Sequence, residues 1–202
     1  MTRTTRRHFL ACWAGIPAIA IGVPRVAGAF QGLGQFAAGA GPAPCKLAEK
    51  ATPAVPPDPA FRPGSPARTS LNEPAIPGTR LVLTGTVSGL TCGPIKGAIV
   101  DFWQADSRGV YDKAGFRLRG HQSTDPAGHY RLETIVPAAA DTRAPHLNVR
   151  VKPPGRAAFA TRLFFPNHAR NTADAAFRSE LVLHVTDGPD PTLATFDIVL
   201  NL

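Results

Sequence analysis

Short runs of β-branched and apolar residues, separated by glycine, proline and aspartate, fill the chain from residue 79 to its end. No apolar pattern with the 3.6-residue period of an α-helix runs long enough for a major helix. Short strands at a spacing of about ten residues are typical of an antiparallel β-sandwich. The sequence therefore predicts an all-β sandwich of roughly seven or eight strands. The expected strands are 80–87, 98–103, 115–119, 129–135, 146–152, 158–165, 181–185 and 194–200.

The first 29 residues have the pattern of an export signal. Arg6 and Arg7 form a twin-arginine pair, an apolar run follows over 11–23, and small residues end the segment at Ala29. The apolar run is shorter than the roughly 20 residues that span a bilayer, and glycine and proline interrupt it. We predict a twin-arginine signal peptide at 1–29, recognised by the twin-arginine export machinery and then cleaved. The protein would be periplasmic or secreted, without a permanent membrane anchor; a retained anchor is the alternative.

Residues 30–78 are expected to form an arm outside the sandwich. Glycine and alanine dominate 30–44, and eight prolines follow between Cys45 and Gly78. Prolines at this density exclude a helix and a central strand. The prediction is a flexible Gly/Ala-rich and Pro-rich arm, either extended over the domain or disordered, which leaves 79–202 as the β-sandwich domain.

Net charge and cysteine content restrict which binding partners and which cellular compartment the sequence allows. The formal charge is +8, and it becomes +4 without the four arginines of 1–29. No block of basic residues remains, so nucleic acid is not an expected partner. Beyond 1–29 the chain keeps Cys45 and Cys92. An exported protein meets an oxidising environment, which favours a Cys45–Cys92 disulfide over two free thiols.

Taken one at a time, the polar residues carry weak functional signals. Tyr111 follows a loop, and His146 and Asn148 lie on one face of a strand because side chains alternate. Arg143 precedes His146 by three residues, beyond a proline, and is able to reach the same pocket. The other histidines of the domain show no ligand spacing, and we expect them to be exposed or hydrogen-bonded. These are His121, His129, His168 and His184.

The order of the motifs is more informative than any single residue. Eight stretches follow one another along the domain: Thr91–Ala98, Val100–Asp106, Gly109–Tyr111, Arg119–Asp125, Gly128–Tyr130, Thr134–Pro137, Arg143–His146 and Thr161–Pro166. Their order and content resemble the intradiol aromatic ring-cleavage dioxygenases, the family of catechol and protocatechuate 3,4-dioxygenases, and especially the smaller exported members. The resemblance covers about residues 45–200.

This resemblance implies an oxidoreductase that cleaves a catechol-type ring with O₂. Members of the family hold a non-haem ferric ion with two tyrosines and two histidines. Phenolate oxygen and imidazole nitrogen suit Fe³⁺, which is a hard and highly charged ion. An arginine beside the ligands is expected to stabilise the charge that develops on the substrate. The implied partners are a small aromatic diol and O₂, and the implied cofactor is Fe³⁺.

Transferred residue by residue, the family pattern is only half present. Tyr111 and His146 stand at two of the four metal-ligand positions, and Arg143 stands at the position of the catalytic arginine. The other two ligand positions hold Ala140 and Asn148, which do not supply a second tyrosine and a second histidine.

Two further residues extend this comparison. Arg162 replaces a usual glutamine, and we assign it to substrate binding. Asp141, next to Ala140, is a candidate replacement carboxylate ligand. Two hypotheses follow. One is an exported ring-cleavage dioxygenase with a modified iron site. The other is a non-catalytic binding module that keeps the sandwich and has lost the metal.

Overall fold

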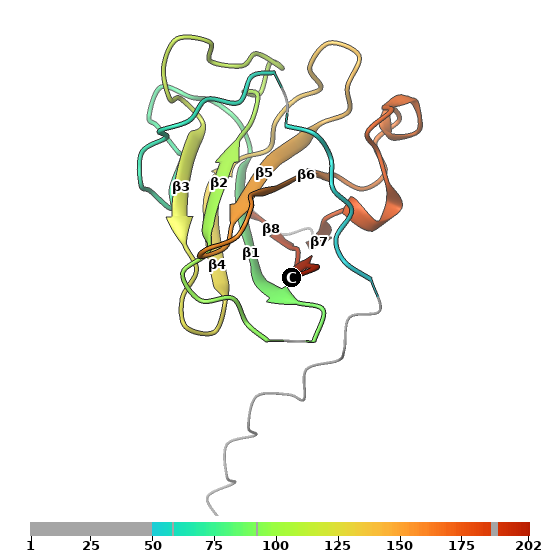
Figure 1. Ribbon diagram of the computed structural model, residues 1–202. Coiled ribbons are helices and arrows are strands. Elements are labelled where there is room, and N and C mark those ends of the chain that lie inside the picture. The colour runs from blue at the N-terminus through green and yellow to red at the C-terminus, as the bar shows by residue number, and fades with distance from the viewer. Residues whose placement is uncertain (1–49, 58, 92, 187–189) are drawn as a thin grey trace, which may run out of the picture. The chain divides into compact units, whose positions relative to one another are not determined.

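The computed structural model describes residues 50–57, 59–91, 93–186 and 190–202, and it confirms the predicted β-sandwich (Figure 1). The predicted signal peptide and both cysteines, Cys45 and Cys92, lie outside the described residues. The strands are β1 (Arg80–Gly89), β2 (Ile99–Trp103), β3 (Arg119–Ser123), β4 (His129–Ile135), β5 (His146–Lys152), β6 (Phe159–Phe164), β7 (His184–Thr186), β8 (Thr192–Thr195) and β9 (Ile198–Leu200). Two short 3₁₀ helices, η1 (Asn171–Ala173) and η2 (Ser179–Leu181), precede β7.

The strands form two sheets. The four-stranded sheet has the order β3-β2-β5-β6, and all its neighbours are antiparallel. The five-stranded sheet has the order β4-β1-β8-β7, and β9 also pairs with β1. Within it β1 pairs antiparallel with β4 but parallel with both β8 and β9. The chain therefore returns to β1 at its C-terminal end.

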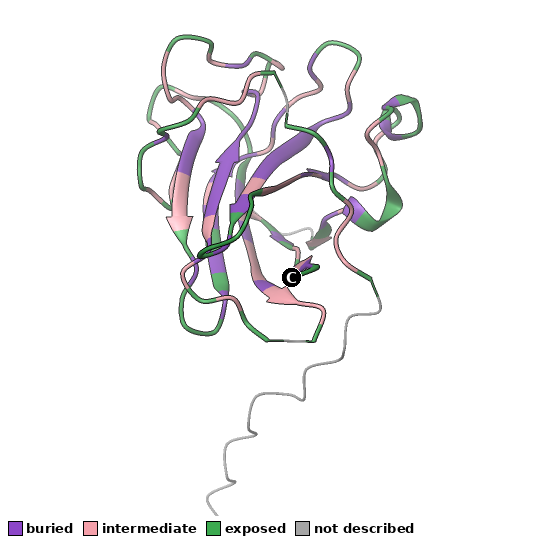
Figure 2. Cartoon of the chain, in the orientation of Figure 1, coloured by how far each residue is buried: buried purple, intermediate pink, exposed green. Residues whose placement is uncertain are grey.

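Figure 2 shows buried residues along the strands of the sandwich. Apolar residues at alternating strand positions form the core between the sheets. Such alternation puts every second side chain into the core and explains the period-two pattern of the sequence. The core side chains of β1, β2, β4 and β5 include Leu81, Leu83, Val100, Phe102, Leu132, Leu147, Val149 and Val151, none of them more than 1% exposed.

The expected strand at 115–119 is instead a turn, and β3 begins where that strand was predicted to end. The carboxylate of Asp112 accepts hydrogen bonds from the backbone N–H groups of Ala114, Gly115 and Arg117. Leu118 then adopts a φ of 53°. A carboxylate that accepts three backbone N–H groups within four residues competes with strand pairing, so the apolar content of this stretch does not lead to a strand.

Two C-terminal predictions also shift. The strand expected at 181–185 starts only at His184, after η2. The one expected at 194–200 divides into β8 and β9 at Phe196 and Asp197. There the Asp197 carboxylate accepts hydrogen bonds from the backbone N–H and the hydroxyl of Thr86. Between β8 and β9, this side-chain bridge replaces the backbone pairing that each of the two strands forms with β1.

The described part of the arm, 50–57 and 59–78, lies on the sandwich as an ordered segment, which is one of the two arrangements expected for it. It passes β6, where Val55 N–H donates to Ala160 O, and then follows β3 (Figure 1). Arg68 N–H donates to His121 O of β3, and Leu71 N–H donates to Glu133 O of β4. These are the edge strands of the two sheets. The arm thus covers the seam between them.

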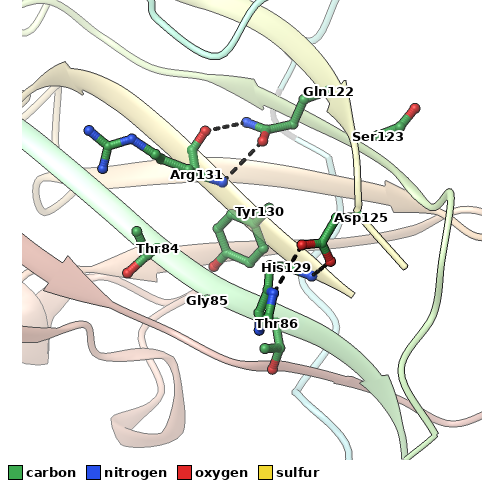
Figure 3. A pocket seen from close by; sticks show the side chains of 9 residues that line it. All are labelled: Thr84, Gly85, Thr86, Gln122, Ser123, Asp125, His129, Tyr130 and Arg131. Carbon is green, nitrogen blue, oxygen red and sulfur yellow. Dashed lines mark hydrogen bonds and ion pairs between the residues drawn. The ribbon is translucent and has the colours of Figure 1, made fainter. Parts of the chain in front are cut away.

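A side-chain bridge links the same two edge strands further along. The Gln122 amide of β3 donates to Arg131 O and accepts from Arg131 N–H of β4 (Figure 3). Beside it, the Asp125 carboxylate lies 3.0 Å from His129 Nδ1, while Ser123 lies apart from this pair. His129 is thus hydrogen-bonded, as its lack of ligand spacing predicts.

None of the helices in the described residues has the length and apolar character that crossing a membrane requires.

Candidate functional site

The site lies on the outer face of the four-stranded sheet, opposite the core. On β5, Leu147 points inward, while His146 and Asn148 point outward. The register places Asn148 between Trp103 of β2 and Arg162 of β6. His146, Asn148 and Trp103 are each at most 3% exposed. Polar groups thus stand on a sheet face that is buried under other segments of the chain.

The loop from β2 to β3 carries Tyr111 onto this face. Its turn is held by Asp106, whose carboxylate accepts the backbone N–H groups of Arg108 and Val110. Burial alone would raise the pKa of Asp106, but these hydrogen bonds hold it below its ordinary value. Gly109 has a φ of +80°, and a Cβ there would lie 2.2 Å from Ala139 O. Glycine therefore allows the Tyr111 loop to pack directly on the Ala139 backbone.

Tyr111 and His146 meet in a chain of hydrogen bonds with fixed direction. Ala144 O is 2.7 Å from His146 Nδ1, and a carbonyl only accepts, so Nδ1 carries the proton of the neutral ring. The lone pair of Nε2 then accepts the Tyr111 hydroxyl proton over 3.1 Å. Asn148 Nδ2 donates to Tyr111 Oη over 2.9 Å and to Trp103 O over 3.2 Å. Each hydrogen bond fixes the donor or acceptor role of the next group.

Burial keeps the two central groups of this chain neutral. Desolvation raises the pKa of Tyr111 above its ordinary value, although the hydrogen bond from Asn148 and the charge of Arg162 oppose the rise. Desolvation also lowers the pKa of His146 to about 4. At neutral pH the site therefore holds a phenol and an uncharged imidazole, which is the pairing that the hydrogen-bond directions require.

A cleft of about 610 Å³ opens beside Tyr111. The Arg143 guanidinium lies over the Tyr111 ring, with Cζ 5.4 Å from the ring centre, and 3.6 Å from the Asp141 carboxylate. Asp141 is 86% exposed at its side chain, so it faces solvent and does not replace a ligand beside His146. The cleft is lined by Pro59, Ala60, Gly109, Val110, Tyr111, Lys113, Asp141 and Arg143.

Of the residues singled out in the sequence, most converge here. Ala140 is 3% exposed and packs with Tyr111 and Trp103 in a small apolar cluster. Arg162 stands opposite Asn148 in the sheet, yet it lines a separate hollow of about 290 Å³ with Val55 and its neighbours. Its assignment to substrate binding stays a prediction.

Sequence reasoning did not single out Trp103 and Arg119 as members of the site. Trp103 lies within a resembling stretch, but its contact with Asn148 depends on the register of β2 against β5. Arg119 of β3 pairs with Trp103 of β2 and is 2% exposed. Register is a long-range property, so neighbouring residues in the sequence do not reveal it.

The donor set does not fit the ferric ion that the resemblance implies. Tyr111 and His146 supply one oxygen and one nitrogen, and Ala140 supplies nothing. Asn148 turns its NH₂ group toward Tyr111 Oη, because Trp103 O, which only accepts, fixes the orientation of the amide. Among the described residues, no group of three or more His, Cys, Asp or Glu side chains gathers in a metal-binding arrangement. A hydrogen-bond donor therefore stands at a position where the resemblance implies a ligand atom.

Comparison with known proteins gives the same family as the order of motifs. A family model described as Dioxygenase matches residues 59–201. Chlorocatechol 1,2-dioxygenase of Rhodococcus opacus is 27% identical over 181 residues, which cover 71% of this chain and 70% of that protein. Catechol 1,2-dioxygenase 1 of Acinetobacter lwoffii is 38% identical over 64 residues, 28% of this chain. The chain spans only 21% of that relative.

A solved structure matches over almost its whole length. It is the dioxygenase domain of a dioxygenase and carbohydrate-binding protein fusion from the cellulolytic bacterium Streptomyces sp. SirexAA-E. The sequences are 42% identical, the TM-score is 0.74, and the match covers 76% of this chain and 99% of that one.

Proposed function

Because this chain belongs to the dioxygenase family that includes the intradiol catechol and protocatechuate dioxygenases, we propose that it binds a catechol-type aromatic without cleaving it. The observation that carries the proposal is the Asn148 amide, which donates to Tyr111 Oη while Tyr111 donates to His146. These contacts satisfy the phenol and the imidazole with each other, and burial keeps both groups uncharged at neutral pH. A site arranged in this way binds polar aromatic groups and does not require a metal.

The cleft has the features that an aromatic diol needs. Its wall includes the Tyr111 ring and the Arg143 guanidinium, which lies over that ring. The guanidinium stays positively charged at neutral pH and binds the faces of aromatic rings. Lys113 adds a second cation at the same cleft. Flat rings with hydroxyl groups fit a pocket that combines an aromatic wall with hydrogen-bond donors.

Metal content and ring cleavage test the proposal on the purified full chain. After growth with iron and gentle purification, we expect far less than one iron per chain and no visible absorption from tyrosinate bound to ferric iron. Calorimetry should detect catechol binding, and an oxygen electrode should detect no consumption of O₂ in the presence of catechol. Stoichiometric iron with steady oxygen uptake in the presence of catechol would refute the non-catalytic reading.

Restoring the missing ligands tests the same reading from the other side. We expect Ala140→Tyr combined with Asn148→His to take up iron and become coloured, because the pair supplies a phenol and an imidazole beside Tyr111 and His146. The matched control is Ala140→Phe with Asn148→His, which has the same bulk without the phenol oxygen. Equal iron uptake by both double variants would contradict the assigned ligand positions.

Ring cleavage remains the second candidate function, for one structural reason. Tyr111 Oη and His146 Nε2 lie 3.1 Å apart, a separation that two neighbouring ligands of one ion also adopt. The iron measurement above separates the two candidates directly.

A further inference from the structure

Arg119, the first residue of β3, is a buried cation that contacts two segments at once. Its side chain lies on the outer face of the four-stranded sheet and the residue is 2% exposed. Nη1 donates to Ala60 O of the arm over 2.6 Å, and Nη2 donates to Asp112 O of the Tyr111 loop over 2.8 Å. One planar guanidinium therefore joins the arm to the loop.

The two carbonyl groups belong to opposite borders of the cleft. Ala60 lines the cleft from the arm, and Asp112 stands between Tyr111 and Lys113, which line it from the loop. Resting on the proposed function, we propose that Arg119 is a positioning residue that holds the two walls of the aromatic-binding cleft at a fixed separation. It acts through Ala60 and Asp112 and does not itself touch the ligand.

The energetic cost of burying Arg119 argues against a role in packing alone. Among the described residues its Nε has no hydrogen-bond partner, and no carboxylate forms an ion pair with it. Burial lowers the pKa of the guanidinium, which the nearby charge of Asp112 only partly opposes. A buried charge without a close counter-charge destabilises the folded protein, and an apolar side chain would avoid this cost. What an apolar residue lacks is the fork that reaches two carbonyls in different segments.

Neighbouring contacts show that the arm wall rests on the same region. Arg68 of the arm donates through Nε to Arg119 O over 2.9 Å. Phe61, next to Ala60, packs on Trp103 with ring centres 5.0 Å apart. Trp103 is 2% exposed under this cover, so its accessibility reports whether the arm stays in place.

The test measures Trp103 directly in the full chain without ligand. Trp13→Phe leaves Trp103 as the single tryptophan, since the sequence contains two. We expect Arg119→Met to raise the acrylamide quenching constant of Trp103 about threefold or more, because the arm opens locally. Arg119→Lys, which keeps the charge and reaches one carbonyl, should give an intermediate value.

Tyr130→Phe is the matched control for lost stability. It removes the partly buried hydrogen bond of 2.7 Å from Tyr130 of β4 to Phe196 O, between β8 and β9 and away from the cleft. We expect it to lower the midpoint of urea unfolding while Trp103 stays as protected as in the wild type. If Arg119→Met and Tyr130→Phe behave alike, Arg119 has only a general structural role and the proposal is wrong. If Arg119→Met does not fold, unchanged quenching in Arg119→Lys leads to the same conclusion.

Catechol affinity gives the second measurement. Calorimetry should show about tenfold weaker catechol binding in Arg119→Met, partial recovery in Arg119→Lys and wild-type binding in Tyr130→Phe. Wild-type affinity in Arg119→Met would overturn the positioning role. Absence of catechol binding in the wild type would instead refute the proposed function, and the quenching result would still decide whether Arg119 holds the two walls.

Discussion

In its first half, from His146 to Val149, β5 is equally buried on both faces, and the two faces are chemically opposite. Leu147 and Val149 point into the core, and His146 and Asn148 point under the arm and loops, yet all four are at most 3% exposed. The inner face meets another sheet whose side chains alternate in the same way. The outer face meets irregular backbone, whose carbonyl groups need donors, and Ala144 O receives one from His146. The covering segment therefore decides which side chains a buried face carries.

This contrast separates the residues that hold the fold from those that form the site. Apolar contacts are non-directional, so the inner face tolerates repacking and contributes mainly to stability. The outer face depends on hydrogen bonds with defined donors and acceptors, so a change there alters geometry and protonation before it unfolds the protein. The largest effects on stability should come from the inner face, and they should leave ligand binding intact.

Leu147→Ala should have the largest effect. Deleting a fully buried leucine in the core leaves a cavity, and we expect a loss of about 2–5 kcal/mol in the free energy of unfolding. Urea unfolding followed by circular dichroism measures it. The folded fraction should bind catechol with wild-type affinity. A loss below about 1 kcal/mol, or a clear change in affinity, would break the division between the two faces.

His146 on the outer face should make the free energy of unfolding depend on pH. The pKa of His146 is lowered to about 4 by burial, against about 6.5 in the unfolded chain, so the folded protein binds fewer protons between these values. Stability is fully present above pH 6.5 and is lost as the pH falls toward 4, by about 3 kcal/mol in total.

Comparison with His146→Gln isolates this contribution. Both proteins are treated with a chelator, and their unfolding by urea is measured at intervals between pH 4 and pH 7. The variant is expected to lose less stability than the wild type over this range, because glutamine does not titrate. Parallel curves for the two proteins would show that His146 is not held neutral by burial.

Asn148→Ala should have the smallest effect on stability, although Asn148 is as buried as Leu147. The change removes the hydrogen bonds to Tyr111 Oη and Trp103 O, but it also removes Oδ1, which has no hydrogen-bond partner in the described part of the chain. Loss and gain nearly offset each other, and we expect about 1 kcal/mol or less. A loss as large as that of Leu147→Ala would show that the outer face also holds the fold.

The fold was predictable where its cause is local. Strands β4 and β5 begin and end where the sequence predicts, since alternation and flanking turn residues fix them. The predicted start of the third strand was wrong because Asp112 gathers three backbone donors and delays β3 until Arg119. The prolines predict no helix in the arm, and none forms in its described part, 50–57 and 59–78. They do not reveal that Leu71 enters the core between two sheet edges.

The site was predictable only in part, for the same reason. Strand parity alone places His146 and Asn148 together, and the order of motifs adds Tyr111. The roles of Trp103 and Arg119 depend on pairings between β5, β2 and β3, which are separated by long stretches of sequence. The direction of the Asn148 amide depends on the Trp103 carbonyl, so neither residue alone discloses it.

The first described segment of the arm is anchored on the last strand of the chain. Thr52 N–H donates to Val199 O, and Val199 N–H donates to the Thr52 hydroxyl, each over 2.9 Å. These residues are 147 positions apart, so this part of the arm makes these contacts only once β9 has been synthesised. The docking of this segment therefore depends on β9 being present. A product that stops short of β9 would carry every residue of the cleft and still leave the arm without its first anchor.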